Sequence, residues 1–157
     1  MHRHLRRLER ISLNPAIFFV TTCTRNRKAI LVSEQVATIL IQEWRRACDR
    51  YGWHVGRYVI MPDHVHLFCA PEPNAGSLSV FVGSWKRWSS RRISELSRTT
   101  SAATAPIWQR EFFDHLLRSE ESYDQKWNYV RENPVRARLT QSADEWPWAG
   151  EIDQLLL

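Results

Sequence analysis

The chain lacks any long hydrophobic segment, because its longest unbroken apolar run is Ala16–Val20. A helix that crosses a bilayer needs about 20 apolar residues, so we expect no membrane span and no membrane partner. The Arg-rich N-terminus also lacks the apolar segment and the small-residue cleavage pattern of a signal peptide. The three cysteines, Cys23, Cys48 and Cys69, are too few and too widely spaced for a disulfide framework or a Cys-based zinc site. We therefore expect reduced thiols in a cytosol.

Lysine is also scarce. Only Lys28, Lys86 and Lys126 occur among the 22 basic residues, so arginine carries most of the positive charge. The net charge is +5 and the isoelectric point is near 9.5. Arginine pairs with phosphate through a planar fork and stacks on bases, and the chain adds 8 Trp, 6 Phe and 4 Tyr. This combination suits a surface that binds single-stranded nucleic acid, although a basic host proteome and a Trp-rich core would produce the same composition.

Apolar patterns, helix caps and turn residues divide the chain into seven elements. Ile17–Cys23 is rich in β-branched and aromatic residues, which is typical of a buried strand. Ser33 is a candidate N-cap, and Gly52 is the candidate end of the helix that it opens. The Pro-Asp pair at 62–63 predicts a hairpin, in which Gly56 is a candidate bulge. The expected elements are strand 17–23, helix 33–50, strands 53–61 and 64–69, a helix from 77 past 93, strand 106–109 and a helix from 119 to Pro134.

The order of strand, helix, strand, strand, helix, strand and helix predicts a ferredoxin-like α+β fold. We expect an antiparallel sheet with helices on one face, and the other face free to meet a ligand. At this length one domain over 1–157 is expected, with a basic arm at 1–12, a small polar linker at 97–105 and a Trp-containing tail at 140–157. In the helix after Ser77, five apolar residues are expected along one side: Leu78, Phe81, Trp85, Trp88 and Ile93.

Two histidines are candidate metal ligands. His64 and His66 are two residues apart on an expected strand, so both imidazoles leave the same face, while Val65 points toward the helices. Two imidazoles on one face suit a divalent cation. An isolated pair with this spacing is more often ordinary surface, but here large apolar neighbours indicate a central strand.

Tyr129 and Asn133 are four residues apart on the last expected helix, so we expect them to share a face. A tyrosine beside a metal and an arginine-rich surface is a candidate nucleophile toward phosphate. Asn133 would add a carboxamide oxygen to the metal. The alternative is that Tyr129 packs between helix and sheet, and that Asn133 ends the helix before a proline.

A basic region is expected to contact nucleic acid. No acidic residue occurs between Pro73 and Ile93, although several cations do. The alternative is a solvated helix face, and for His115 either an orienting role at the metal or a purely structural one. The candidate DNA contacts are Arg25, Arg27, Lys86, Arg87, Arg91, Arg92, Trp108, Gln109, Arg110 and His115.

Four segments, taken in order, form a pattern that is shared with a known family. The most distinctive is MPDHVHLF at 61–68, which is similar to the HUH motif of two histidines around a bulky apolar residue. The others are FFVTT at 18–22, IWQREFFDH at 107–115 and YVRENPVRA at 129–137. Together they resemble the REP-associated tyrosine transposases, bacterial relatives of the single-tyrosine transposases of small insertion sequences. The resemblance covers the chain from about residue 17 to residue 148.

The resemblance implies an HUH-type nuclease fold that cleaves and joins single-stranded DNA at hairpins of repeated extragenic palindromes. It implies Mg²⁺ or Mn²⁺ at His64 and His66, with Asn133 completing the site, and Tyr129 as the nucleophile that forms a 5′-phosphotyrosine. No nucleotide cofactor is expected, because no Gly-rich phosphate loop is present. We expect a monomer or homodimer in the bacterial cytoplasm. The chain departs from the family pattern at Arg138, where relatives often have Gly, and at Phe113, where Tyr or Trp is common.

Two other functions are compatible with the same fold. One is a non-catalytic module that binds single-stranded nucleic acid, with stacked bases on the sheet and arginines on the phosphates. Against it, the third strand carries two histidines where such a module would place stacking rings. The other is a hydrolytic metal phosphodiesterase, for which the sequence lacks a cluster of acidic ligands for two metals.

Overall fold

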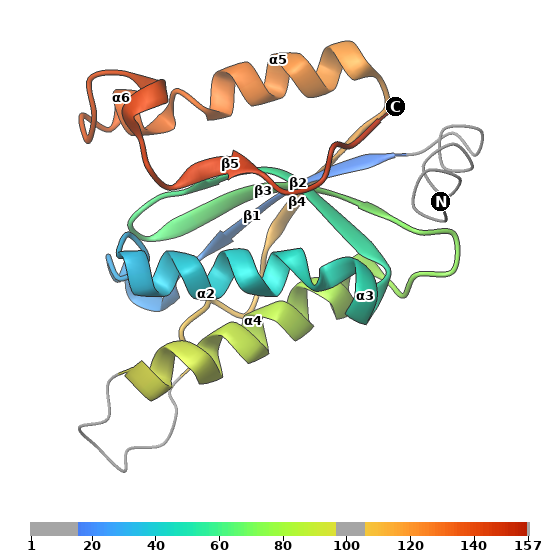
Figure 1. The fold of residues 1–157 in the computed structure, drawn as a ribbon, viewed down its shortest axis with the longest axis horizontal. Helices are drawn as coiled ribbons and strands as arrows, with labels where there is room; N and C mark the ends of the chain where they lie inside the picture. Colours follow the sequence, from blue (N-terminus) through green and yellow to red (C-terminus); the bar gives the residue numbers. More distant parts are fainter. Residues whose placement is uncertain (1–15, 97–105, 157) are drawn as a thin grey trace.

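The computed structural model describes residues 16–96 and 106–156. The expected basic arm at 1–12 and the linker at 97–105 lie outside the described residues. Figure 1 shows a sheet between two helical layers. The elements are β1 (Ile17–Cys23), the short 3₁₀ helix η1 (Arg25–Arg27), α2 (Glu34–Arg45), α3 (Ala47–Tyr51), β2 (Trp53–Ile60), β3 (His64–Pro71), α4 (Leu78–Leu96), β4 (Phe113–Leu117), α5 (Glu120–Val130), α6 (Asn133–Arg136), η2 (Ala143–Glu145) and β5 (Ala149–Glu151).

The five strands form one antiparallel sheet in the order β4-β1-β3-β2-β5. The first four strands have the ferredoxin-like order, because β1 and β2 lie on either side of β3. The α+β, ferredoxin-like prediction is confirmed. β1 and β3 are central, and their register places Thr21 opposite His66 and Cys23 opposite His64. The histidine strand therefore lies in the middle of the sheet.

The β2–β3 hairpin forms as expected, and its irregularity lies at Gly56. The register between the two strands shifts between Val55 and Tyr58. A Cβ atom at Gly56 would lie 2.7 Å from Leu155 and 2.9 Å from the Tyr123 hydroxyl. Glycine is needed here because the C-terminal segment and α5 both approach the backbone closely.

One face of the sheet is closed by α2 and α4. The Ser33 hydroxyl accepts a hydrogen bond from the Val36 amide, which caps α2 as expected. Trp44 of α2 and Trp85 of α4 are 1% and 0% exposed, and their rings meet edge to face at 5.6 Å. Val65 and Leu67 of β3 are buried in the same core. The alternation of β3 thus supplies one apolar face, on which this layer packs.

The opposite face is not free, which corrects the expectation of helices on one face only. Helix α5 covers part of it, and Figure 1 shows α5 on one side of the sheet and α2 and α4 on the other. Tyr123 and Val130 of α5 are buried in a second core with Phe68 of β3 and Phe19 of β1. Large apolar residues at 19 and 68 need cover as much as those on the first face do, and α5 provides it.

The prediction of a strand at 106–109 is wrong. Only an isolated bridge joins Thr24 and Trp108 there, and the strand that pairs with β1 is β4, a few residues later. Four of the five β4 residues lack deep burial, so the segment does not show the apolar pattern of a strand. Edge strands have only one neighbour, and their sequence signal is correspondingly weak.

The two long helices expected at 33–50 and 119–134 are each divided. A single residue, Arg46, separates α2 from α3, and Gly52 ends α3 with a φ of 73°. Helix α5 ends at Val130, and Pro134 occupies the first turn of the separate α6. Tyr129 and Asn133 therefore lie on consecutive helices and not on one.

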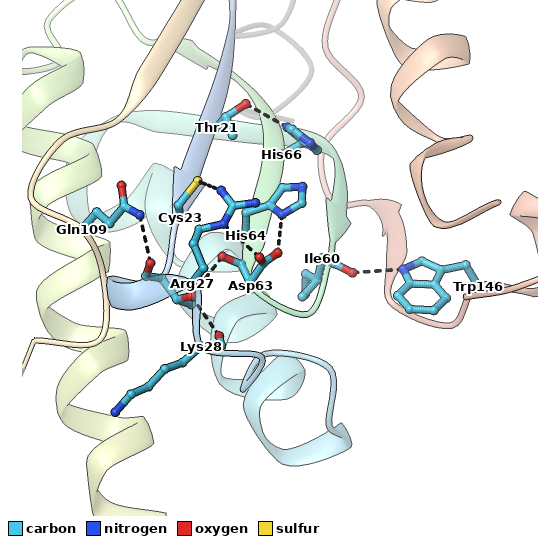
Figure 2. A network of polar contacts seen from close by, with 11 residues as sticks. Thr21, Cys23, Arg27, Lys28, Ile60, Asp63, His64, His66, Gln109 and Trp146 are labelled. Atoms are coloured by element: carbon cyan, nitrogen blue, oxygen red, sulfur yellow. Dashed lines mark hydrogen bonds and ion pairs between the residues drawn. The ribbon is translucent and has the colours of Figure 1, made fainter. Parts of the chain in front are cut away.

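The C-terminal tail adds a strand that the sequence does not reveal. β5 pairs with β2, and the indole nitrogen of Trp146 donates to the Ile60 carbonyl at 3.0 Å (Figure 2). None of the helices among the described residues combines the length and hydropathy that crossing a bilayer requires.

Candidate functional site

His64 and His66 leave the sheet on the face that α5 covers, in the row of residues that β3 shares with Phe68. Their ring centroids lie 4.8 Å apart, with the rings nearly perpendicular. The Nδ1 atom of His64 lies 2.7 Å from Asp63 Oδ1, and that of His66 lies 2.8 Å from the Thr21 hydroxyl (Figure 2). The expected placement of both imidazoles on one face is confirmed.

This pair fits a divalent cation. When a ligating imidazole donates its Nδ1 proton to an oxygen, its Nε2 carries the lone pair that binds the metal. The Asp63 carboxylate is such a partner and favours the form of His64 with its proton on Nδ1, and the Thr21 hydroxyl can accept the corresponding proton from His66. The stacking of His66 on Phe19, with centroids 5.3 Å apart, also restrains the second ring. The donor set is two imidazole nitrogens, and any further ligands must come from water, DNA or another side chain.

Burial and nearby cations keep His66 neutral. Burial is the largest influence, followed by the charges of His64, Lys126, Arg136 and Arg27, and together they lower the pKa of His66 to about 3. A neutral imidazole is the form that binds a metal. The residue before the pair, Asp63, has a lowered pKa, because its partners His64 and Arg27 outweigh the opposing influence of burial.

Tyr129 differs from the other tyrosines in its exposure. Of the four tyrosines, all within the described residues, only Tyr129 is exposed, at 62%. Tyr58 and Tyr123 are buried, and Tyr51 is partly buried. Burial raises the pKa of Tyr123 to about 12, although contacts with Arg57 oppose it, so this phenol resists ionisation. The alternative, that Tyr129 packs between helix and sheet, is wrong, because its side chain faces solvent.

Two cations beside Tyr129 are functional candidates that the sequence analysis missed. The Arg136 guanidinium lies 4.1 Å from the centre of the Tyr129 ring. The Lys126 ammonium lies 5.9 Å from the same ring and 4.7 Å from the ring of Phe19, which stacks on His66. Lys126 therefore connects the tyrosine with the histidine pair. Its position three residues before Tyr129, on one helix face, was the signal available.

Asn133 is less well placed than expected. It opens α6, and its side-chain oxygen accepts a hydrogen bond from the Arg136 guanidinium. The same guanidinium donates to the Tyr129 carbonyl at 2.7 Å. The Asn133 oxygen is therefore already engaged by Arg136, and a metal would have to share this oxygen with the guanidinium or displace it.

A basic groove with a volume of about 950 Å³ lies between η1, α4 and the segment 106–110. Seven of the ten predicted DNA contacts line it, and no acidic residue is among the described residues that do. The lining residues that belong to α4 recur at intervals of three or four, as residues on one face of a helix do. The lining residues are Arg25, Asn26, Gly83, Lys86, Arg87, Ser90, Arg91, Pro106, Trp108, Gln109 and Arg110.

Two of the predicted contacts, Lys86 and Trp108, hold the groove together, and a third, Arg92, does not line it. Lys86 is 8% exposed, and its ammonium donates to the Gln109 and Arg110 carbonyls at 2.6 and 3.2 Å. Burial lowers the pKa of Lys86. Trp108 is buried, and its indole nitrogen donates to Ser89 at 3.0 Å. Arg92 points away, donating to Gln42 at 2.5 Å with the buried Glu43 nearby.

Arg27 connects the groove wall with the histidines. Its Nε donates to Asp63 Oδ2 at 2.9 Å, and the other oxygen of Asp63 meets His64 (Figure 2). Asn26 and Arg27 both have left-handed backbone, with φ of 57° and 53°. Such strain costs of order 1 kcal/mol per residue and is often found at functional sites.

Exposed aromatic rings border both regions. Trp88, expected on the same side of its helix as Trp85, is 41% exposed, and the Arg91 guanidinium lies 5.2 Å from its ring. Phe113 of β4 is 63% exposed and lies opposite Thr21, the partner of His66. His115 is exposed on β4 opposite Phe19, so it lies on the histidine face. These rings are available for base stacking.

Comparison with known proteins gives a consistent family. A profile of the family described as "Transposase IS200 like" matches residues 15–133. The REP-associated tyrosine transposase of Escherichia coli K12 is 26% identical over 133 residues, covering 84% of this chain and 74% of the relative. A Haemophilus influenzae protein, provisionally assigned the same name, is 24% identical over 142 residues, covering 85% and 78%.

Solved structures share the fold. A REP-associated tyrosine transposase bound to a REP hairpin superimposes with a TM-score of 0.63 at 19% identity, covering 87% of this chain and 76% of that one. The resemblance read from four sequence segments is thus confirmed at the level of the family.

Proposed function

The chain belongs to the family of IS200-like transposases, and from this premise we propose that it is a metal-dependent endonuclease and strand transferase for single-stranded hairpin DNA. The relatives named REP-associated tyrosine transposases suggest repeated extragenic palindromes as the substrate. Because this substrate is chromosomal DNA, we place the protein in the bacterial cytoplasm.

Cleavage would proceed by transesterification. The Tyr129 oxygen attacks the scissile phosphorus, the 3′ oxygen of the upstream strand leaves as a hydroxyl, and the downstream 5′ phosphate remains on the tyrosine. Attack by another 3′-hydroxyl reverses the step and joins strands, so no nucleotide cofactor is required. When bound by His64 and His66, Mg²⁺ or Mn²⁺ would polarise the phosphate and neutralise its developing charge.

The chain's own side chains would prepare this step. Lys126 and Arg136 place positive charge beside Tyr129, where the phosphate must approach. Asp63 and Thr21 orient the two imidazoles. Arg136 also holds Asn133, so we propose that phosphate binding draws Arg136 away and releases the carboxamide. Two linked observations support the proposal most directly. Tyr129 is exposed beside Lys126 and Arg136, and His64 and His66 point from the same face of the sheet.

The basic groove would hold the DNA. The exposed guanidiniums of Arg25, Arg87, Arg91 and Arg110 can pair with phosphates, while Lys86 maintains the groove from below. Arg27, between the groove and the histidines, would guide the strand toward the scissile position.

A covalent-adduct experiment tests the proposal. Wild-type protein with Mg²⁺ and single-stranded hairpin DNA should form an adduct that survives denaturation, with a 3′-labelled oligonucleotide and not with a 5′-labelled one. Tyr129→Phe should bind DNA but form neither nick nor adduct. Tyr51→Phe is the matched control, because its buried hydroxyl has no hydrogen-bond partner among the described residues.

Three outcomes would contradict the mechanism. An adduct with Tyr129→Phe would identify another nucleophile. Cleavage by the wild type without an adduct would make water the nucleophile and the protein a simple nuclease. Binding without cleavage under any divalent cation would favour the non-catalytic binding module.

A further inference from the structure

A second group of metal-ligating side chains lies at the far end of the hairpin from His64. Cys48, His54 and Glu72 form this cysteine–histidine–glutamate cluster, and their ligand atoms all lie within 4.8 Å of one another. The His54 Nε2 atom lies 3.3 Å from Cys48 Sγ and 2.6 Å from Glu72 Oε1. Cys48 Sγ and Glu72 Oε1 are 4.0 Å apart. His64 opens β3 and Glu72 follows its end, so the cluster lies roughly 25 Å from the catalytic histidines.

The backbone brings these three residues together through Gly52. Cys48 lies on α3, and Gly52 ends that helix with a left-handed backbone, so the chain turns at once into β2 and His54. The Gly52 carbonyl accepts a hydrogen bond from the Glu72 amide at 2.7 Å. Three segments separated in sequence are thereby fixed around one point, and the positions do not depend on a flexible loop.

His54 is oriented as a metal ligand would be. Its Nδ1 atom lies 3.0 Å from Asp153 Oδ2, in the segment after β5. Donation of the Nδ1 proton to Asp153 leaves the Nε2 lone pair directed at Cys48 and Glu72. A carboxylate behind a histidine in this way is characteristic of zinc sites.

We propose that Cys48, His54 and Glu72 bind a zinc ion, with water as the fourth ligand and Asp153 in support. The sulfur, nitrogen and oxygen donors suit Zn²⁺, whereas Mg²⁺ prefers sites built from oxygen. On binding, the Cys48 thiol loses its proton to solvent and its sulfur forms the bond to the metal. The sequence excludes a zinc site built from several cysteines, but not one in which folding brings a single cysteine to other ligands.

The expected role is a structural cross-link. The ion would tie α3 to β2 and to the loop before α4, and through Asp153 to the C-terminal segment. The side chains of His54 and Glu72 are 15% and 21% exposed, so the site is shielded but reachable. The inference is independent of the proposed DNA cleavage, because none of its ligands contacts the histidine pair or the groove.

Metal binding to the purified full chain tests the inference. After treatment with a chelator and dialysis, the protein should take up one equivalent of Zn²⁺ and resist exchange by excess Mg²⁺. At about 100-fold excess over Kd, the melting temperature should rise by roughly 5–10 °C. Co²⁺ in place of Zn²⁺ should give a sulfur-to-metal charge-transfer band in the near ultraviolet.

Variants distinguish this site from others. Cys48→Ser and His54→Gln should lose the bound zinc and the thermal shift, and Cys48→Ser should also lose the charge-transfer band. Cys23→Ser is the matched control, because that cysteine lies beside His64, and it should keep all three signals. The double variant His64→Ala/His66→Ala should also retain one zinc. Zinc uptake that persists in Cys48→Ser with an unchanged charge-transfer band, or the absence of any stoichiometric uptake by the wild type, would overturn the inference.

Discussion

The two faces of the sheet use the same strand for opposite purposes. On the α2 and α4 face, β3 contributes Val65 and Leu67 to a closed aromatic core. On the α5 face, the alternate positions begin with His64 and His66 before they continue into Phe68. The second face is apolar only where α5 covers it, and polar at the end that faces Arg27 and Asp63. A strand with period two can thus stabilise one layer and carry chemistry on the other.

The largest expected effect is on DNA cleavage, when the histidines of the second face are replaced. His64→Ala and His66→Ala should each lower DNA cleavage at least about 100–1,000-fold, because a metal contributes several kcal/mol to stabilisation of the transition state. DNA binding should change little, since the affinity comes from arginines in the groove. Nicking of a labelled hairpin, with a filter-binding assay in parallel, measures both. Cleavage that survives both substitutions or ignores a chelator would contradict the metal role.

A substitution on the closed face should change the free energy of unfolding and not the chemistry of DNA cleavage. Trp85→Ala should lower the free energy of unfolding by about 3–5 kcal/mol, because this indole is fully buried against Trp44 and Trp108. The matched variant Trp88→Ala, three residues along the same helix, should change it by less than about 0.5 kcal/mol. Urea denaturation compares them. Equal losses would mean that Trp88 is buried after all.

Acid should destabilise the histidine face. The pKa of His66 is about 3 in the folded state and about 6.5 when unfolded, so between these values only the unfolded chain binds the proton. The free energy of unfolding should therefore fall as the pH decreases from about 6.5 toward 3, by at most about 1.4 kcal/mol per pH unit. Above pH 6.5 this contribution is complete. Denaturation in EDTA should show a weaker pH dependence for His66→Gln, and identical profiles would refute the assignment.

Salt should weaken DNA binding through the groove. If Arg25, Arg87, Arg91 and Arg110 each contact one phosphate, the logarithm of the binding constant should fall with the logarithm of salt concentration with a slope near −3. Replacing all four with alanine should nearly abolish this slope. Arg92→Ala is the control, because this side chain contacts α2 and should leave the slope unchanged. If the quadruple variant keeps the slope, the groove arginines are only solvated surface and do not contact phosphates.

The smallest expected effect concerns the turn after α6. Arg138 has a φ of 60°, in the region that favours glycine. Arg138→Gly should raise the free energy of unfolding by about 0.5–1 kcal/mol, because the strain is relieved. Arg138→Ala removes the charge but keeps the backbone strain, so it should not stabilise. Thermal denaturation of the three proteins decides whether strain is present.

Much of the fold could be predicted because its signals are local. Ser33 caps α2 and Gly52 ends α3, each through contacts within a few residues or through its own backbone preference. The strand β4 could not be predicted, because an edge strand depends on its neighbour β1 more than on its own pattern. Trp88 was grouped with Trp85 on one side of the helix, but helical spacing does not indicate how much of that side is covered, and Trp88 is exposed.

By itself, the sequence determined which chemical groups the protein has and which of them leave the same face of a strand. The two-residue period of a strand is a property of the backbone, so His64 and His66 had to point the same way wherever β3 lay. Only the tertiary structure decided what meets them: that α5 covers their face, that Tyr129 alone among the tyrosines is exposed, and that Arg136 holds Asn133. It likewise brought Cys48, His54 and Glu72 together. These contacts depend on which apolar surfaces pack against each other over the whole chain, and the spacing of residues along the sequence does not reveal that packing.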